Sequence, residues 1–164
     1  METPTNLIRS RFVIGFFGGL AALMLMWIVV AAFSQNEWAT IQQGDSDIYM
    51  VRVADNPLER ARGLAQTDPS ALGDAIGMLF VFGDTEPHTF TMKGMRYGLD
   101  FLWIKEGKIV QIDRNVPAPA DGEDPLTVTT YPISVDMVIE LPAGMAAQLQ
   151  YLVGHELTIN LNPE

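Results

Sequence analysis

The sequence contains no cysteine among its 164 residues. Disulfide bonds, thiolate metal sites, thioether attachment of haem and catalysis by a thiol are therefore excluded. An oxidising compartment favours disulfides but does not require them, so the absence leaves an extracytoplasmic location open.

Positive charge is also scarce, because 10 Lys and Arg residues face 20 Asp and Glu residues and give a formal net charge of -10. A surface that binds nucleic acid needs concentrated Lys and Arg to neutralise phosphates. We therefore expect no nucleic-acid partner. The acidity is typical of a protein kept soluble by its net charge.

Motifs of several common enzyme classes are missing from the sequence. It has no G-x-S-x-G, no G-x-G-x-x-G and no phosphate-binding loop. These absences argue against a serine hydrolase and against a dinucleotide-binding enzyme. We predict no catalytic residue and no cofactor.

Residues able to bind a metal ion are few. The only histidines are His88 and His155, and His88 ends the segment 84–88, DTEPH. Its two acids and its histidine alternate as on one strand face, but Pro87 favours a loop. The acidic loop 121–124 lacks the dense alternation of a dedicated calcium loop. We therefore predict no metal site.

A run of 22 residues without charge, Phe12–Phe33, is the most informative segment present. As a helix it would be about 33 Å long, enough to cross the ~30 Å hydrocarbon core of a bilayer. Arg9 and Arg11 precede the run, whereas acidic residues follow it. Because positive residues stay cytoplasmic, we expect the C-terminal domain outside, in the periplasm of a diderm bacterium.

A cleaved signal peptide is the alternative interpretation of this run. Val30-Ala31-Ala32 offers a small-residue cleavage site, but the run is longer than a usual signal-peptide core. Small residues four apart instead suggest helix packing within the membrane. The residues concerned are Gly15, Gly18, Gly19 and Ala22.

The chain therefore divides into an anchor and one outer domain. The expected parts are a cytoplasmic N-terminus 1–11, a transmembrane helix 12–33, a polar tether 34–46 and a β domain 47–164. Trp38, in the tether, is expected at the headgroup level of the membrane.

The outer domain reads as mainly β. Strands are predicted over 47–53, 77–82, 88–93, 99–105, 108–115, 128–131, 135–141 and 157–161. A short helix capped by Asn56 is predicted from Pro57 to the residues before Gly63, and a second over 142–153. The absence of βαβ alternation favours a small, mostly antiparallel β-barrel or rolled sheet with two short helices.

Five segments of this domain resemble the DUF192 family in order and spacing. They are Arg62-Gly63-Leu64, 77–82 (GMLFVF), 90–93 (FTMK), 99–104 (LDFLWI) and 138–144 (VIELPAG). The resemblance covers roughly Ile48 to Leu161 and implies a compact, exported β-rich fold with no settled reaction. The chain departs from the family pattern at Thr91, Gly94 and His155, which favours a structural role.

The best candidate polar cluster falls in or beside these segments. Its members are Arg62, Lys93, Arg96 and Asp100. In one interpretation the cations form an anion or carboxylate pocket in which Asp100 orients one of them. In the other, Lys93 and Asp100 form a partly buried ion pair and Arg62 caps loop carbonyls.

Two functions of different classes follow. The first is a membrane-anchored, non-catalytic accessory or assembly subunit of a larger membrane complex, for example a photosynthetic or respiratory one. Its helix would contact integral membrane subunits and lipid, and its β domain would dock on the periplasmic face. The alternative is an anchored extracytoplasmic module that binds, or an enzyme that converts, a small ligand.

Overall fold

The computed structural model describes residues 37–161 of the chain. The expected membrane helix 12–33, with Gly15, Gly18, Gly19 and Ala22, lies outside these residues. Within residues 37–161, no helix combines the length and the apolar character that crossing a membrane requires.

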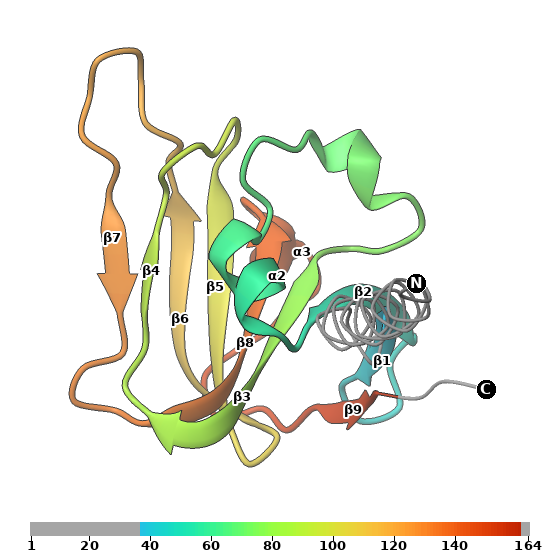
Figure 1. Ribbon diagram of the computed structural model, residues 1–164. Coiled ribbons are helices and arrows are strands. Elements are labelled where there is room, and N and C mark those ends of the chain that lie inside the picture. The colour runs from blue at the N-terminus through green and yellow to red at the C-terminus, as the bar shows by residue number, and fades with distance from the viewer. Residues whose placement is uncertain (1–36, 162–164) are drawn as a thin grey trace, which may run out of the picture. The chain divides into compact units, whose positions relative to one another are not determined.

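Strands dominate the described part of the chain (Figure 1). They are β1 Trp38–Gln42, β2 Tyr49–Ala54, β3 Met78–Glu86, β4 Thr89–Thr91, β5 Leu99–Lys105, β6 Lys108–Val116, β7 Thr127–Thr129, β8 Val135–Pro142 and β9 Thr158–Asn160. The helices are α2 Pro57–Arg62, α3 Met145–Gln148 and the 3-10 helix η1 Pro69–Leu72.

Seven strands form one sheet in the order β6-β5-β8-β3-β2-β1-β9, and β4 pairs with β7 in a separate ribbon. Neighbouring strands are antiparallel except β2 and β3, which run parallel. The sheet is strongly curled, as Figure 1 shows. The predicted fold class, a mainly β, mostly antiparallel rolled sheet with two short α-helices, is confirmed for this domain.

The curl brings the two ends of the sheet together. Lys108 at the start of β6 forms an antiparallel bridge with Glu156, just before β9. The Ile109 amide donates to the His155 carbonyl, and the Gly154 amide donates to the Ile109 carbonyl. The sheet is therefore nearly closed, because the segment that leads into β9 also bonds to β6.

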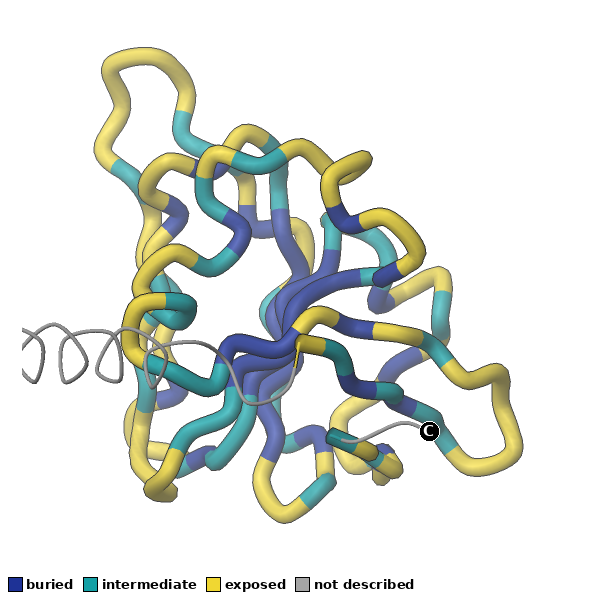
Figure 2. Tube along the Cα trace, turned by 45° about the vertical axis from the view of Figure 1, so that its right-hand side comes forward, coloured by how far each residue is buried: buried dark blue, intermediate teal, exposed yellow. Residues whose placement is uncertain are grey.

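The central strands are buried on both faces, which explains the continuous apolar runs of β3 and β5. On β5, Phe101 and Trp103 belong to one buried cluster, and Leu102 and Ile104 belong to another. Successive side chains of a strand point to opposite faces, so the two clusters lie on opposite faces of the sheet. Figure 2 shows these buried segments converging at the centre of the domain.

Different elements pack against the two faces of the main sheet. Ile41 of β1 and Ile109 of β6, near opposite ends of the sheet, share a cluster with Leu102, so this face is the inside of the curl. We call the opposite side, which carries Phe101 and Trp103, the outer face. It is covered by η1, by the chain that follows α2 and by the β4–β7 ribbon.

Local signals in the sequence placed several elements correctly. The Asn56 side chain accepts hydrogen bonds from the Leu58 and Glu59 amides, so it caps α2 as predicted. Glu106 and Gly107 both have positive φ and join β5 to β6, which confirms the predicted hairpin.

The predicted tether 34–46 is wrong for residues 38–42, which form β1. This strand pairs with β2 and β9 inside the main sheet, so the domain begins before residue 47. Ala39 and Ile41 are fully buried, and their period-two pattern was hidden by polar neighbours. Trp38 is a strand residue whose ring lies under the Arg52 guanidinium, 5.8 Å from the ring centroid.

The predicted helix 142–153 is also too long. Pro142 is the last residue of β8, and α3 spans only Met145–Gln148. Gln150 adopts a left-handed φ of 58°, which ends the helix. The apolar spacing of Met145 and Leu149 reflects packing against the inner cluster and not a three-turn helix.

Candidate functional site

A pocket of about 360 Å³ opens on the outer face of the sheet. Its walls come from the end of α2 and the residues after it, from β3, from β4 with the following turn, and from one residue of β8. In Figure 1, α2 lies in front of the central strands, with β4 beside them. This volume lies within the range of sites that hold small molecules.

Aromatic rings form the apolar wall of the pocket. Phe80 and Phe82 project from β3, and Phe90 projects from β4. The Phe80 and Phe90 rings meet edge to face with centroids 4.9 Å apart, and Phe90 also contacts Phe101 and Trp103. These contacts attach the β4–β7 ribbon to the sheet and fix the aromatic wall.

Gly63 shapes the pocket where α2 ends. Its φ of 50° ends the helix, and its amide donates to the Glu59 carbonyl. A Cβ atom at this position would lie 3.1 Å from Phe80 Cζ and 3.4 Å from Glu140 Oε2. Glycine is therefore favoured here for two reasons: it adopts the positive φ that ends α2, and it has no side chain to crowd Phe80 and Glu140.

Glu140 is the acidic residue that lines the pocket. Its β8 position pairs it with Met78 of β3 and Phe101 of β5, so it faces the outer cluster. The side chain is only 5% exposed, and Oε2 has no hydrogen-bond partner among the described residues. Burial raises the pKa of Glu140 from 4.5 to about 8, although a backbone hydrogen bond with Leu64 opposes the rise. Burial therefore favours the neutral, protonated form of the Glu140 carboxyl.

Three cationic side chains line the same pocket. The Arg60 guanidinium donates to the Asp55 and Val81 carbonyls at 2.6 and 3.0 Å and lies over the Phe82 ring. Arg62 and Lys93 are exposed, and neither side chain has an ion-pair or hydrogen-bond partner within residues 37–161. Arg60 is thus structural, whereas Arg62 and Lys93 are free to contact a ligand.

His88 lies at the edge of the pocket and stacks on Phe82 with ring centroids 3.6 Å apart. Desolvation lowers its pKa despite the opposing charges of Glu86 and Asp84. Ligand atoms of Asp84, Glu86 and His88 lie within 4.8 Å of one another. The sequence indicated that Pro87 would place this segment in a loop, but β3 extends through Glu86 and aligns the three groups. The carboxylates of Asp84 and Glu86 are both exposed to solvent. The separate acidic loop 121–124, considered above for calcium, is exposed as well.

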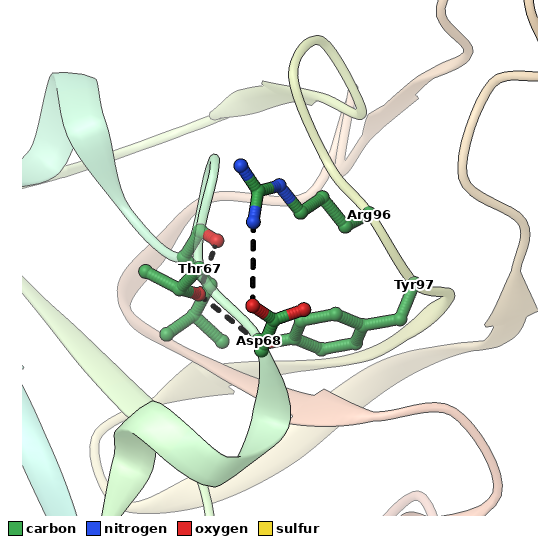
Figure 3. Close-up of polar contacts among 5 residues, drawn as sticks. Thr67, Asp68, Arg96 and Tyr97 are labelled. Carbon is green, nitrogen blue, oxygen red and sulfur yellow. Dashed lines mark hydrogen bonds and ion pairs between the residues drawn. The ribbon is translucent and has the colours of Figure 1, made fainter.

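The structure divides the predicted cluster of Arg62, Lys93, Arg96 and Asp100. Arg62 and Lys93 line the pocket, but Arg96 does not. Arg96 instead pairs with Asp68 at 3.3 Å on the surface. Figure 3 shows this pair beside Thr67, whose hydroxyl donates to the Leu64 carbonyl and lies 3.5 Å from the Tyr97 hydroxyl. Arg96, in the connection between β4 and β5, thus contacts the loop that follows α2 and not the pocket.

The prediction that Asp100 belongs to this cluster is wrong. Asp100 precedes Phe101 on β5, so it points to the inner face, away from the pocket. Its carboxylate is fully buried and accepts hydrogen bonds from the Asn115 amide at 2.7 Å and the Ala146 amide at 2.9 Å. The expected pair with Lys93 is therefore excluded, and Asp100 instead secures β6 and the first turn of α3.

Sequence reasoning missed Glu140. The signal was present, since Glu140 is the one acid within the apolar run 137–141, where a surface strand would alternate. Among the buried side chains of the described region, Asp100 and Thr130 have hydrogen-bond partners. One carboxyl oxygen of Glu140 and the hydroxyl of Tyr151 have none, and of these two residues Glu140 lines the pocket.

The family model of DUF192, described as uncharacterised, matches residues 39–159. The chain belongs to the DUF192 family. The match includes β1, in agreement with a domain that begins before residue 47. Comparison with curated proteins gave no match.

Two solved structures resemble this DUF192 protein. One, from Sinorhizobium meliloti 1021, is described as a proposed transcription regulator; it is 31% identical, with a TM-score of 0.60, over 75% of this chain and 92% of that chain. The other, from Novosphingobium aromaticivorans DSM 12444, is of unknown function; it is 26% identical, with a TM-score of 0.58, over 74% of this chain and 83% of that chain.

Proposed function

We propose that the DUF192 domain of this chain is a binding module for a small molecule. The observation that carries the proposal is Glu140, a buried carboxyl that lines a pocket of about 360 Å³ and whose Oε2 has no hydrogen-bond partner within residues 37–161. An unpaired buried polar group costs about 1–3 kcal/mol, so a ligand that hydrogen-bonds to it recovers that energy. Arg62 and Lys93, whose side chains have no partner in the described part of the chain, supply further donors at the same pocket.

Binding is favoured over hydrolysis because the lining provides a single carboxylic acid. Glu140 is the only Asp or Glu among the described residues that line the pocket, and no serine lines it. Paired-carboxylate chemistry of the glycosidase type therefore has no second acid there. The regulator role named for the S. meliloti protein is not proposed here, since a net charge of -10 disfavours nucleic acid.

We further propose that the run 12–33 anchors this module in the cytoplasmic membrane, with the β domain on the periplasmic side. The length of the run and the arginines before it support this placement. An accessory subunit of a membrane complex is the second candidate function. The small-residue strip of Gly15, Gly18, Gly19 and Ala22 supports it, because such strips let helices approach closely.

A thermal-shift screen of the full chain in mild detergent tests the binding function. Two variants on α2 provide a matched pair, because Ala61 and Leu58 are both exposed but only Ala61 lines the pocket. We expect at least one small molecule to stabilise the wild type and Leu58→Trp but not Ala61→Trp. If no compound separates the two variants, the pocket is not a binding site.

Co-purification in mild detergent tests the accessory role. The complex hypothesis predicts a fixed set of integral membrane proteins that remains with the wild-type chain. Replacement of both Gly15 and Gly19 by Leu is expected to release that set, whereas replacement of Leu20 and Leu23 by Ile is not. Recovery of the wild-type chain alone would contradict the role.

A further inference from the structure

The residues that line the pocket form three chemical zones, which together select one class of ligand. Glu140 is 5% exposed and occupies the buried end, whereas Arg62 and Lys93 are exposed and occupy the mouth. Phe80, Phe82 and Phe90 line the wall. A ligand that satisfies all three zones is polar at one end, apolar in the middle and charged at the other.

We propose that the pocket binds an amphipathic anion with an aromatic or similarly flat apolar body. This assignment rests on the proposed binding function. The anionic group contacts Arg62 and Lys93 at the mouth, the apolar body lies against the three phenylalanines, and a hydroxyl at the far end hydrogen-bonds with Glu140.

The charge distribution carries the first part of the assignment. The chain has 10 Lys and Arg residues, and Arg60, Arg62 and Lys93 all line this one pocket of a protein with net charge -10. Arg60 is already bonded to two backbone carbonyls, so the two free cations determine the preferred charge. A cationic ligand would be repelled by them, and an anion gains charge-assisted hydrogen bonds.

The buried end carries the second part. A charged group beside Glu140 would have to leave water, whereas a neutral hydroxyl can both donate to and accept from a carboxylic acid. Gly63 lies beside this end, and a side chain there would narrow it, because a Cβ would lie 3.4 Å from Oε2. The neutral polar group of the ligand therefore belongs at this end and the anion at the mouth.

The apolar wall carries the third part. The Phe80 and Phe90 rings pack edge to face at 4.9 Å, and Phe82 and Phe90 do so at 6.4 Å. Rings held at fixed angles by their neighbours favour a flat apolar body through the same edge-to-face and offset contacts. A volume of about 360 Å³ accommodates a single ring with a short side chain.

Calorimetric titration of the full chain in mild detergent with matched probes tests the assignment. The probes are 3-(4-hydroxyphenyl)propionate, its amide, 3-phenylpropionate and tyramine. We expect the hydroxylated carboxylate to bind about fivefold or more tightly than the amide, than phenylpropionate and than tyramine.

Variants identify which side chains bind the carboxylate and which one binds the hydroxyl of the probe. Arg62→Gln with Lys93→Gln should remove the preference for the carboxylate over the amide. Arg96→Gln with Lys105→Gln removes the same charge outside the pocket and should leave it unchanged. Glu140→Leu should remove the preference for the hydroxyl while keeping the preference for the carboxylate.

Two results would overturn the assignment and leave the binding function intact. One is tyramine binding as tightly as the carboxylate, and the other is an equal effect of the two cation double variants on every probe. Failure of the proposed function is a separate result, since it requires that no compound of any charge distinguishes Ala61→Trp from Leu58→Trp in the thermal-shift screen.

Discussion

Replacement of Glu140 by glutamine should change how the stability of the domain depends on pH. Burial raises the pKa of Glu140 from 4.5 to about 8 in the folded protein. Between these values the folded state holds a proton that the unfolded state has released. Stability from this group is therefore complete below pH 4.5 and is lost as the pH rises through 8.

The size of the effect follows from the shift. Each pH unit between the two pKa values changes the free energy of unfolding by about 1.4 kcal/mol, and the change between pH 5 and pH 9 sums to about 4 kcal/mol. Glu140→Gln cannot ionise and keeps nearly the same shape, so its stability should lack this component. The wild type should therefore lose about 4 kcal/mol relative to the variant over this range.

Urea unfolding of both full chains in the same mild detergent at several pH values measures this difference. His88, whose pKa is lowered mainly by desolvation, gives the opposite trend, since its contribution is lost as pH falls below 6.5. Because both proteins contain His88, its contribution cancels in the comparison. If the difference stays within about 1 kcal/mol from pH 5 to pH 9, Glu140 is ionised in the folded protein and the reasoning fails.

Three further substitutions test the structural assignments by urea unfolding of the full chain. Asp100→Ala removes the acceptor of the Asn115 and Ala146 amides from a fully buried position, so it should destabilise by about 2–4 kcal/mol, and a loss below 1 kcal/mol would contradict its role on the inner face. Gly63→Ala places a Cβ 3.1 Å from Phe80 at a positive φ and should cost about 2 kcal/mol, whereas Gly73→Ala, also at positive φ but in open space, should cost less. Arg96→Ala breaks only the exposed pair with Asp68 and should change stability by less than about 0.5 kcal/mol; a larger loss would show that this pair orders the loop.

Local patterns in the sequence predicted most of the elements because their signals are local. Asn56 before Pro57 and the pair Glu106-Gly107 determine backbone geometry within a few residues. The continuous apolar runs of β3 and β5 correctly indicated buried strands. β1 escaped prediction because only two buried residues, Ala39 and Ile41, carry its pattern.

The site was harder to predict because it depends on which face of a strand each side chain occupies. Lys93 and Asp100 are near in sequence, and their opposite charges suggested an ion pair. Asp100 and Phe101 are consecutive residues of β5, so their side chains point to opposite faces of the sheet. The composition of the segment does not show which of the two faces the pocket. The sequence showed Glu140 as an acid in an apolar run, but its burial beside the pocket follows only from a β8 that is buried on both faces.

The most direct test of the binding function is native mass spectrometry of the full chain purified in mild detergent from the cells that produce it. We predict that the wild type and Leu58→Trp carry the same additional small-molecule mass and that Ala61→Trp lacks it. Identical spectra for all three proteins, with or without an additional mass, would contradict a ligand held in the Glu140 pocket.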